Sequence, residues 1–263
     1  MSVPMAPLVA SPSPPGPRRR PPSVLPAALR HHLCLWVGGL PAPASRGASE
    51  VRVVPHVANG RPGWDGARPL LTGLVDPCGN ALVAVPTGQA ARVTDLLRHR
   101  MDGDWVAGLT DLPAFLGRPR HTVERVAFRW STAPADLPAV GVWVPTASPA
   151  LPAWLRQFGD KALVAFDEDG RYLAGVGLKR HDSIGREISV GTEPHARGRG
   201  LARCLVAQAA RHVHADGRIP TYLHTFDNAA SSRVASAAGF GDLGWSALML
   251  SDEPVAAAAG TAA

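Results

Sequence analysis

Cysteine is scarce in this chain, and its spacing excludes two classes of small stabilised domain. Only Cys34, Cys78 and Cys204 occur among 263 residues, an odd number, far apart and without a CxxC pair. Neither a disulfide framework nor a zinc site is indicated by such a pattern. We therefore expect a cytoplasmic protein, kept reduced, with no bound metal.

Long apolar runs are also missing. No segment approaches the ~18 uninterrupted apolar residues of a transmembrane helix, so we expect no membrane partner. The basic residues Arg18 to Arg20 precede an apolar stretch, as in a signal peptide, but prolines, Arg30 and the pair His31-His32 interrupt it. The sequence thus argues against secretion.

Lysine is rare as well, since Lys161 and Lys179 are its only occurrences among 27 basic residues. The formal net charge of +6 therefore reflects an arginine-rich composition. Basic and aromatic residues do not alternate along one face, as they do in a nucleic-acid binder. We expect no nucleic-acid partner, although an anionic ligand agrees with the charge.

Composition also divides the chain. A hydrophobic content of 46% is enough for a sizeable core. Residues 1–48 are rich in Pro and Arg and residues 253–263 in Ala, and both ends are predicted to be disordered. Residues 49–120 match no signature and form an N-terminal α/β region of unassigned role, whereas the pattern sharpens within 121–252.

Apolar periodicity predicts alternating strands and helices between these ends. Two apolar runs around Asp169-Gly170 predict a β-hairpin, because glycine tolerates the positive φ of the turn. A third strand, 186–192, follows the hairpin. The remaining predicted strands are 81–86, 123–130, 140–145, 221–226 and 244–250, and the remaining predicted helices start near 87, 105, 152 and 229.

A glycine-rich turn, HARGRG at 195–200, leads directly into a helical pattern that starts at Leu201. Glycine is poorly suited to a helix interior, so Gly198 and Gly200 require another reason. The first turn of a helix offers unpaired N–H groups and a partial positive charge, which bind phosphates. Bare glycines let the ligand approach those groups. A P-loop is excluded because GxxxxGK[ST] is absent, and a dinucleotide fingerprint because Arg203 stands at its third glycine.

The run RGRGLA, 197–202, resembles the Q/R-x-x-G-x-G/A pattern of the GCN5-related N-acetyltransferase (GNAT) superfamily, whose loop holds the pyrophosphate of acetyl-coenzyme A (acetyl-CoA). A second resemblance is the segment from Asn228 to Gly239-Phe240, a helix with an asparagine cap that ends in Gly-Phe. The order of elements agrees over 160–252 and more weakly from 121.

The resemblance implies a mixed α/β fold, in which helices flank a mostly antiparallel sheet with splayed strands, plus an N-terminal α/β extension. Residues 121–252 would be the acetyltransferase domain. Residues 49–120 would be a degenerate second copy, an added domain that shapes the acceptor pocket, or the first elements of the one domain. The residues expected to bind acetyl-CoA are Val190, Gly191, Thr192, Arg197, Gly198, Arg199, Gly200, Leu201, Ala202 and Asn228.

The activity implied by the resemblance is direct transfer of an acetyl group from acetyl-CoA to a primary amine of a small molecule or peptide. The thioester carbonyl would meet a free backbone N–H near Val190 or Gly191. Glu187 is the first candidate for the general base and His224 the second. Glu187 has the alternative of an ion pair with a neighbouring arginine, and the acceptor and a homodimer are both left open. His181-Asp182 is expected to be a solvated turn.

One position departs from the family pattern. Ala235 stands where many members have a tyrosine that protonates the departing thiolate. The candidate hydroxyl or imidazole groups nearby are on Ser231, Ser232, Tyr222 and His224. The departure leaves open an alternative function, that of a catalytically silent acyl-CoA-binding or regulatory module.

Overall fold

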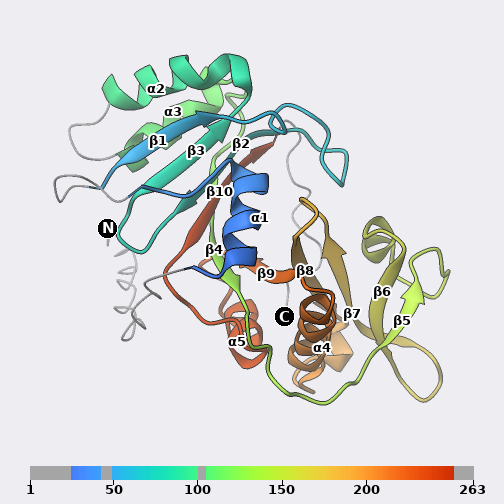
Figure 1. The fold of residues 1–263 in the computed structure, drawn as a ribbon. Helices are drawn as coiled ribbons and strands as arrows, with labels where there is room; N and C mark the ends of the chain where they lie inside the picture. Colours follow the sequence, from blue (N-terminus) through green and yellow to red (C-terminus); the bar gives the residue numbers. More distant parts are fainter. Residues whose placement is uncertain (1–24, 43–48, 100–104, 252–263) are drawn as a thin grey trace, which may run out of the picture.

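The computed structural model describes residues 25–42, 49–99 and 105–251, which share one ten-stranded sheet (Figure 1). The strands lie in the order β1-β3-β2-β10-β4-β9-β8-β7-β6-β5. Their bounds are β1 Val51–Pro55, β2 Pro69–Val75, β3 Ala81–Val85, β4 Glu124–Trp130, β5 Val142–Pro145, β6 Lys161–Phe166, β7 Tyr172–Lys179, β8 Gly185–Thr192, β9 Ile219–His224 and β10 Ser246–Ser251.

Helices flank this sheet on both faces. The α-helices are α1 Ala27–Val37, α2 Ala90–His99, α3 Trp105–Phe115, α4 Leu201–Ala215 and α5 Ala229–Ala237, and the 3-10 turns are η1 Thr87–Gln89, η2 Ala153–Gln157 and η3 Pro194–Ala196. Only β1·β3 and β8·β9 pair in parallel, and the other neighbours are antiparallel. The predicted mixed, mostly antiparallel sheet is therefore confirmed. Among the described residues, no helix has the length and apolarity to cross a membrane.

The N-terminal strands continue the same sheet. β2 pairs along β10, and β10 pairs in turn with β4. Residues 49–120 and 121–252 thus contribute to one continuous sheet. The predicted hairpin of β6 and β7 is confirmed, with Gly170 at φ 77° in its turn. The strands β1 and β2 were not predicted, because residues 49–120 match no family signature.

The two faces of the sheet carry different helices. Ile188, Val190 and Tyr222 pack in one cluster with residues of α4 and α5. Ile219 and Leu223 pack instead in a cluster with α1. Because side chains alternate along a strand, these two sets mark opposite faces, which we call the α4 face and the α1 face.

The α1 face is also covered by η2. A Cβ at Gly175 would lie 2.7 Å from Leu155 Cδ1, and one at Gly177 would lie 2.3 Å from Phe158. The absence of side chains at these two positions of β7 lets η2 and Phe158 lie directly on the strand. The predicted helix of 152–159 is thus a short 3-10 turn held against glycines.

The expectation of disorder for residues 1–48 is wrong for Ala27–Val37, which form α1. Leu29, Leu33 and Val37 are fully buried on this helix, at i, i+4 and i+8, and Trp36 is 8% exposed. Apolar residues at this spacing form one helical stripe, and here the stripe meets β-strands from both halves of the sheet. The prolines that flank the segment hid this periodicity.

Replacing Leu33 with alanine should therefore lower the free energy of unfolding by about 2–4 kcal/mol, because a fully buried leucine leaves a cavity. Denaturant unfolding at neutral pH measures the change. Leu35→Ala on the same helix is the control, since Leu35 is 40% exposed and should change stability by less than about 0.5 kcal/mol. Equal effects of the two variants would mean that α1 does not belong to the core.

Candidate active site

The glycine-rich turn opens α4 as the sequence predicts. Gly198 and Gly200 both have φ of 77°, the left-handed region that glycine enters without strain. Gly200 is the N-cap residue of α4, and no side chain caps the helix there. The first N–H groups of α4 are therefore open to an external acceptor of hydrogen bonds.

A cavity of about 540 Å³ lies at this turn. It is lined by Thr192, Ala196, Arg197, Gly198, Arg199, Gly200, Leu201, Ala202, Arg203, Ala230, Arg233, Val234 and Ala237. All but three of the residues expected to bind acetyl-CoA are among them. Val190 instead packs in the core on the α4 face, Gly191 lies against Trp154, and Asn228 caps α5 by accepting a hydrogen bond from the Ser231 N–H.

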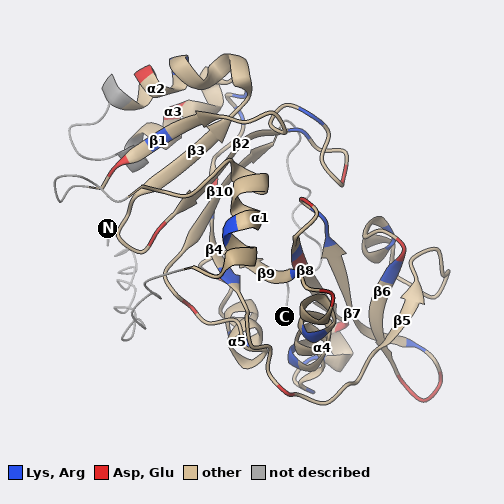
Figure 2. Cartoon of the chain, viewed as in Figure 1, with Lys and Arg blue, Asp and Glu red and all other residues tan. Residues whose placement is uncertain are grey.

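Four arginines line this cavity, and no acidic residue does: Arg197, Arg199, Arg203 and Arg233. Basic positions on α4 are visible in Figure 2. Arg203 and Arg233 are not among the residues expected from the sequence. Arg203 lies one helical turn beyond Arg199, so helical spacing could have identified it. Arg233 lies on α5, and only the packing of α5 beside α4 places it at the cavity. The arrangement fits a polyanion such as a pyrophosphate.

Next to this cavity the strands β8 and β9 separate. They pair in parallel only at Gly185, Arg186 and Glu187, and the last of these lies opposite Thr221. From Thr221 onward β9 pairs with β4 on its other side, and β8 stays paired with β7 alone. The register therefore produces the splay that the family resemblance implied, with its vertex at Glu187 and Thr221.

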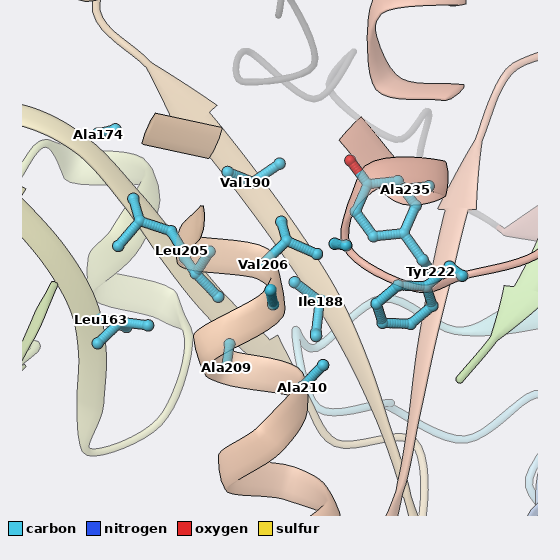
Figure 3. Close-up of a cluster of buried hydrophobic side chains, with 14 of the residues drawn as sticks. Leu163, Ala174, Ile188, Val190, Leu205, Val206, Ala209, Ala210, Tyr222 and Ala235 are labelled. Carbon is cyan, nitrogen blue, oxygen red and sulfur yellow. The ribbon is translucent and has the colours of Figure 1, made fainter. Parts of the chain in front are cut away.

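The α4 face of the splay is apolar (Figure 3). Ile188 and Val190 point from β8 toward α4, and Tyr222 points the same way from β9. Glu187 alternates with Ile188 along β8, so its side chain lies on the α1 face. His224 alternates in phase with Tyr222 and lies on the α4 face. The two candidate bases are thus on opposite faces of the sheet and cannot act as a pair.

Glu187 is buried and held by Lys179 and His181. Its Oε1 accepts a hydrogen bond from Lys179 Nζ at 2.6 Å, and its Oε2 lies 2.7 Å from His181 Nε2. Burial by itself raises the pKa of this carboxyl, but the charge of Lys179 and the bonds to His181 and Lys179 outweigh burial and lower the pKa to about 2. Glu187 is therefore ionised and weakly basic, and its partners are not the arginines that the sequence suggested.

His224 is 5% exposed and lies near the open end of the splay. Its Nδ1 lies 2.8 Å from the Thr225 carbonyl oxygen, which fixes a proton on Nδ1, and its Nε2 is buried with no hydrogen-bond partner within the described structure. Burial is the main cause that lowers the pKa of this imidazole. His224 is thus a neutral ring whose Nε2 can accept a hydrogen bond.

The side chain of Tyr222, on β9, packs close to Ala235. Tyr222 on β9 packs in the same cluster as Ala235, and its hydroxyl lies 2.8 Å from Ser231 Oγ on α5 (Figure 3). Burial raises the pKa of the Tyr222 hydroxyl, so it stays protonated at neutral pH. Ser232 differs, because its hydroxyl accepts from the Arg129 guanidinium. Tyr222 and Ser231 are the protonated hydroxyls placed on the α4 face.

A second cavity, of about 460 Å³, lies on the α1 face. Its lining comprises Trp36, Gly63, Trp64, Asp65, Ala67, Pro69, Leu71, Thr72, Arg120, His121, Thr122, Glu124, His181, Met249, Leu250 and Ser251. None of these residues is among the functional residues expected from the sequence. They come from α1, β2, β4, β10, the loops before β2 and β4, and the turn between β7 and β8, so no local pattern could have grouped them.

His181 and Asp182 correct the expectation of a solvated turn. His181 is bonded to buried Glu187 and lines the second cavity, while the Asp182 carboxylate lies 2.5 Å from Nδ1 of His32 in α1. Although burial raises the pKa of Asp182, the hydrogen bond from His32 outweighs it and leaves the pKa lowered. The pair fixes α1 to the end of the β7-β8 hairpin. Across the described ranges, no three His, Cys, Asp or Glu side chains converge to hold a metal ion.

Comparison with known proteins agrees with the motif. The model of the family described as FR47-like protein matches residues 168–247. Mycothiol acetyltransferase of Actinosynnema mirum is 30% identical over 166 residues, which are 57% of this chain and 53% of that protein. The chain thus spans about half the length of this curated relative.

The chain is also similar to solved structures of GNAT-family proteins. A putative acetyltransferase from the GNAT family of Novosphingobium aromaticivorans is 23% identical with a TM-score of 0.42, over 50% of this chain and 66% of that one. A GNAT-family acetyltransferase of Colwellia psychrerythraea is 14% identical with a TM-score of 0.39, over 54% of this chain and 62% of that one. The FR47-like family model, matched over residues 168–247, and the curated acetyltransferase relative agree with the resemblance of the RGRGLA loop to the GCN5-related N-acetyltransferase superfamily.

Proposed function

We propose that this protein is an acetyl-CoA-dependent N-acetyltransferase that acetylates a primary amine by direct transfer. The observation that carries the proposal is the arginine-lined cavity at Gly198 and Gly200, which adjoins the separation of β8 and β9. The name of the curated relative, an acetyltransferase, supports the transferred group. Three free cysteines agree with a reducing, cytoplasmic location.

The chain's residues fit acetyl-CoA. The open N–H groups at the start of α4 would receive the pyrophosphate, and Arg197, Arg199, Arg203 and Arg233 would neutralise its charge. When bound, the cosubstrate supplies a thioester whose acetyl group is activated for transfer. Thr192 at the end of β8 lines the same cavity, so the strand leads from the phosphate site toward the splay.

The splay offers groups that the reaction requires. Between Ile188 and Thr192 the edge of β8 that faces away from β7 pairs with no strand of the described residues, so an N–H at Val190 or Gly191 would be available to stabilise the oxyanion. Glu187 at the vertex and His224 near the open end are the two groups proposed from the sequence to manage the amine proton. Tyr222 and Ser231 would protonate the thiolate in place of the tyrosine missing at 235.

The second candidate function is a catalytically silent acyl-CoA-binding or regulatory module. Ala235 favours it, because the family's usual acid is absent there, and so does the low basicity of Glu187. Both functions require acetyl-CoA to bind. They differ in turnover, so release of coenzyme A measured with a mixture of primary amines separates them: an amine-dependent release supports the enzyme, and its absence in a protein that binds acetyl-CoA supports the module.

Gly198→Asp should weaken acetyl-CoA binding at least tenfold, which corresponds to about 1.4 kcal/mol. The new carboxylate would repel the pyrophosphate at the start of α4. Isothermal titration calorimetry measures the affinity. Gly217→Asp is the matched control, because Gly217 follows the other end of the same helix with φ of 70° and, like Gly198, has open space around a Cβ. Equal affinities of the two folded variants would contradict the assignment of the loop.

A further inference from the structure

We propose that the cavity of about 460 Å³ on the α1 face binds the acceptor and that His181 on its wall takes the proton from the acceptor's amine. Glu187 is then a positioning residue that holds the imidazole. This inference rests on the proposed acetyl transfer and adds to it the place of the acceptor, its chemical class and the group that receives the proton.

Glu187 and His181 lie where the second cavity meets the separation of β8 and β9. Glu187 is the last residue of β8 that pairs with β9, and its carboxylate faces α1. The proposed acetyl-CoA site opens on the α4 face instead, at the start of α4. A group that passes between the separated strands from the α4 face would therefore arrive beside Glu187 and His181. The second cavity reaches this vertex through His181, which is bonded to Glu187, and the first cavity reaches β8 at Thr192, so a donor and an acceptor would meet at the separation of the two strands.

The bond to Glu187 fixes the tautomer of the His181 ring. His181 Nε2 is 2.7 Å from a carboxylate that the charge of Lys179 keeps ionised, so Nε2 carries a proton and donates to Glu187. In the neutral ring this leaves the lone pair on Nδ1, the nitrogen that accepts a proton. Glu187 then stabilises the imidazolium that forms, as a buried carboxylate does for a catalytic histidine. Glu187 is not itself the base, because Lys179 and His181 already occupy both of its oxygens.

Neighbouring side chains hold the His181 ring in a fixed orientation. The His181 ring lies 5.1 Å from the Trp36 ring and meets Trp64 edge-on at 6.5 Å. The next residue, Asp182, is bound to His32 of α1. A general base must be held in a fixed orientation to act efficiently. Here α1, the helix that the sequence did not predict, fixes both the ring and the backbone beside it.

The cavity wall indicates the class of acceptor. Trp36 and Trp64 provide aromatic surface, and Leu71 and Met249 provide aliphatic surface. Asp65 and Glu124 add carboxylates, and Arg120 and His121 also line the cavity. Aromatic faces and carboxylates attract an ammonium group, and the apolar wall favours a hydrophobic body. We therefore expect a primary amine on an aromatic or aliphatic body rather than a small hydrophilic amine.

The neutral amine nitrogen forms a bond to the acetyl carbonyl carbon, and the carbon-sulfur bond breaks after the tetrahedral stage. The amine proton passes to Nδ1 of His181, and the electron pair of the broken bond leaves on the coenzyme A sulfur. The products are the N-acetylated amine and coenzyme A, and the proton on His181 returns to solvent or to the thiolate.

The acceptor class is tested with two probes, 2-phenylethylamine and ethanolamine, on the full chain with saturating acetyl-CoA. We expect kcat/KM for 2-phenylethylamine to be at least tenfold higher. Trp64→Ala should reduce this preference, because Trp64 is a wall of the cavity and its substitution leaves the acetyl-CoA site untouched. Equal or inverted preference in the wild-type protein would overturn the acceptor class.

The role of His181 is tested with His181→Gln and His181→Gly. We expect kcat to fall by about 10² in both, with the acetyl-CoA Kd within threefold of the wild type, because proton transfer is lost and phosphate binding is kept. Added imidazole should restore part of the activity of His181→Gly and leave that of His181→Gln unchanged, a result that a merely structural role would not give. His214→Gln, an exposed histidine of α4 outside both cavities, is the control.

The outcomes separate this inference from the function on which it rests. A wild-type protein that does not bind acetyl-CoA would overturn both. A wild-type protein that acetylates amines while His181→Gln keeps full kcat would overturn the role of His181 and leave the proposed function intact. Loss of activity without imidazole rescue, together with a lowered melting temperature of the variants, would assign His181 a structural role and also overturn the inference.

Discussion

Glu187→Gln is expected to lower the free energy of unfolding by about 3 kcal/mol at pH 7. Glutamine imitates the protonated acid, and the pKa of Glu187 is lowered from 4.5 to about 2 in the folded protein. A lowered pKa means that the folded state favours the ionised form. The variant loses this preference and leaves Lys179 and His181 without their buried anion.

The same shift predicts a pH dependence with a definite sign. The stability that the Glu187 carboxylate contributes is complete above its unfolded pKa of 4.5 and is lost as the pH falls toward about 2. The difference in free energy of unfolding between the wild-type protein and Glu187→Gln should therefore shrink as the pH falls between these values. Denaturant unfolding of both proteins at pH 7, 4 and 3 measures this difference.

The matched control is Glu168→Ala, because Glu168 is exposed in the turn between β6 and β7. It should change stability by less than about 0.5 kcal/mol at each pH. A constant difference between wild type and Glu187→Gln from pH 7 to pH 3 would contradict the ion pairs as the source of the stability.

The double change Arg199→Glu and Arg203→Glu is expected to weaken acetyl-CoA binding by about 10², because two attractive charges beside the proposed pyrophosphate become repulsive. The affinity of the wild-type protein should fall as the salt concentration rises, since exposed charges are screened. The affinity of the variant should depend on salt more weakly. Isothermal titration calorimetry at two ionic strengths gives both results.

The control for this prediction is the pair Arg92→Glu and Arg171→Glu, which changes the net charge equally at exposed sites outside both cavities. If the control variant loses as much affinity as the cavity variant, long-range charge explains binding and the four arginines do not form a site. If neither loses affinity, acetyl-CoA does not bind at the start of α4.

The glycine-rich turn before α4 could be predicted from the sequence because it is a local feature. Gly198 and Gly200 break a helical pattern at a fixed distance from Leu201, and both the positive φ and the open helix start follow from neighbouring residues alone. The β6-β7 hairpin and the Asn228 cap of α5 are local in the same sense. For such features the chemistry of a few consecutive residues decides the structure.

For α1, the Pro-rich composition led to a wrong prediction of disorder. Leu29, Leu33 and Trp36 have helical spacing, but Pro-rich flanks suggested a chain without a core. What stabilises α1 is burial against strands that lie far along the chain, together with the pair of His32 and Asp182. An isolated helix of this length is marginal in water, so only the tertiary contacts decide that it forms.

The sequence by itself determined the order of the elements from β6 onward, the glycine loop and its arginines, and the presence of Glu187 and His224 on adjacent strands. Only the tertiary structure decided that these two residues face opposite sides of the sheet, because their relative orientation depends on the register of β8 against β9, which places Glu187 beside Thr221. It also decided that Glu187 is paired with His181. Side-chain direction alternates along every strand, so the function of a strand residue depends on which distant segment covers each face.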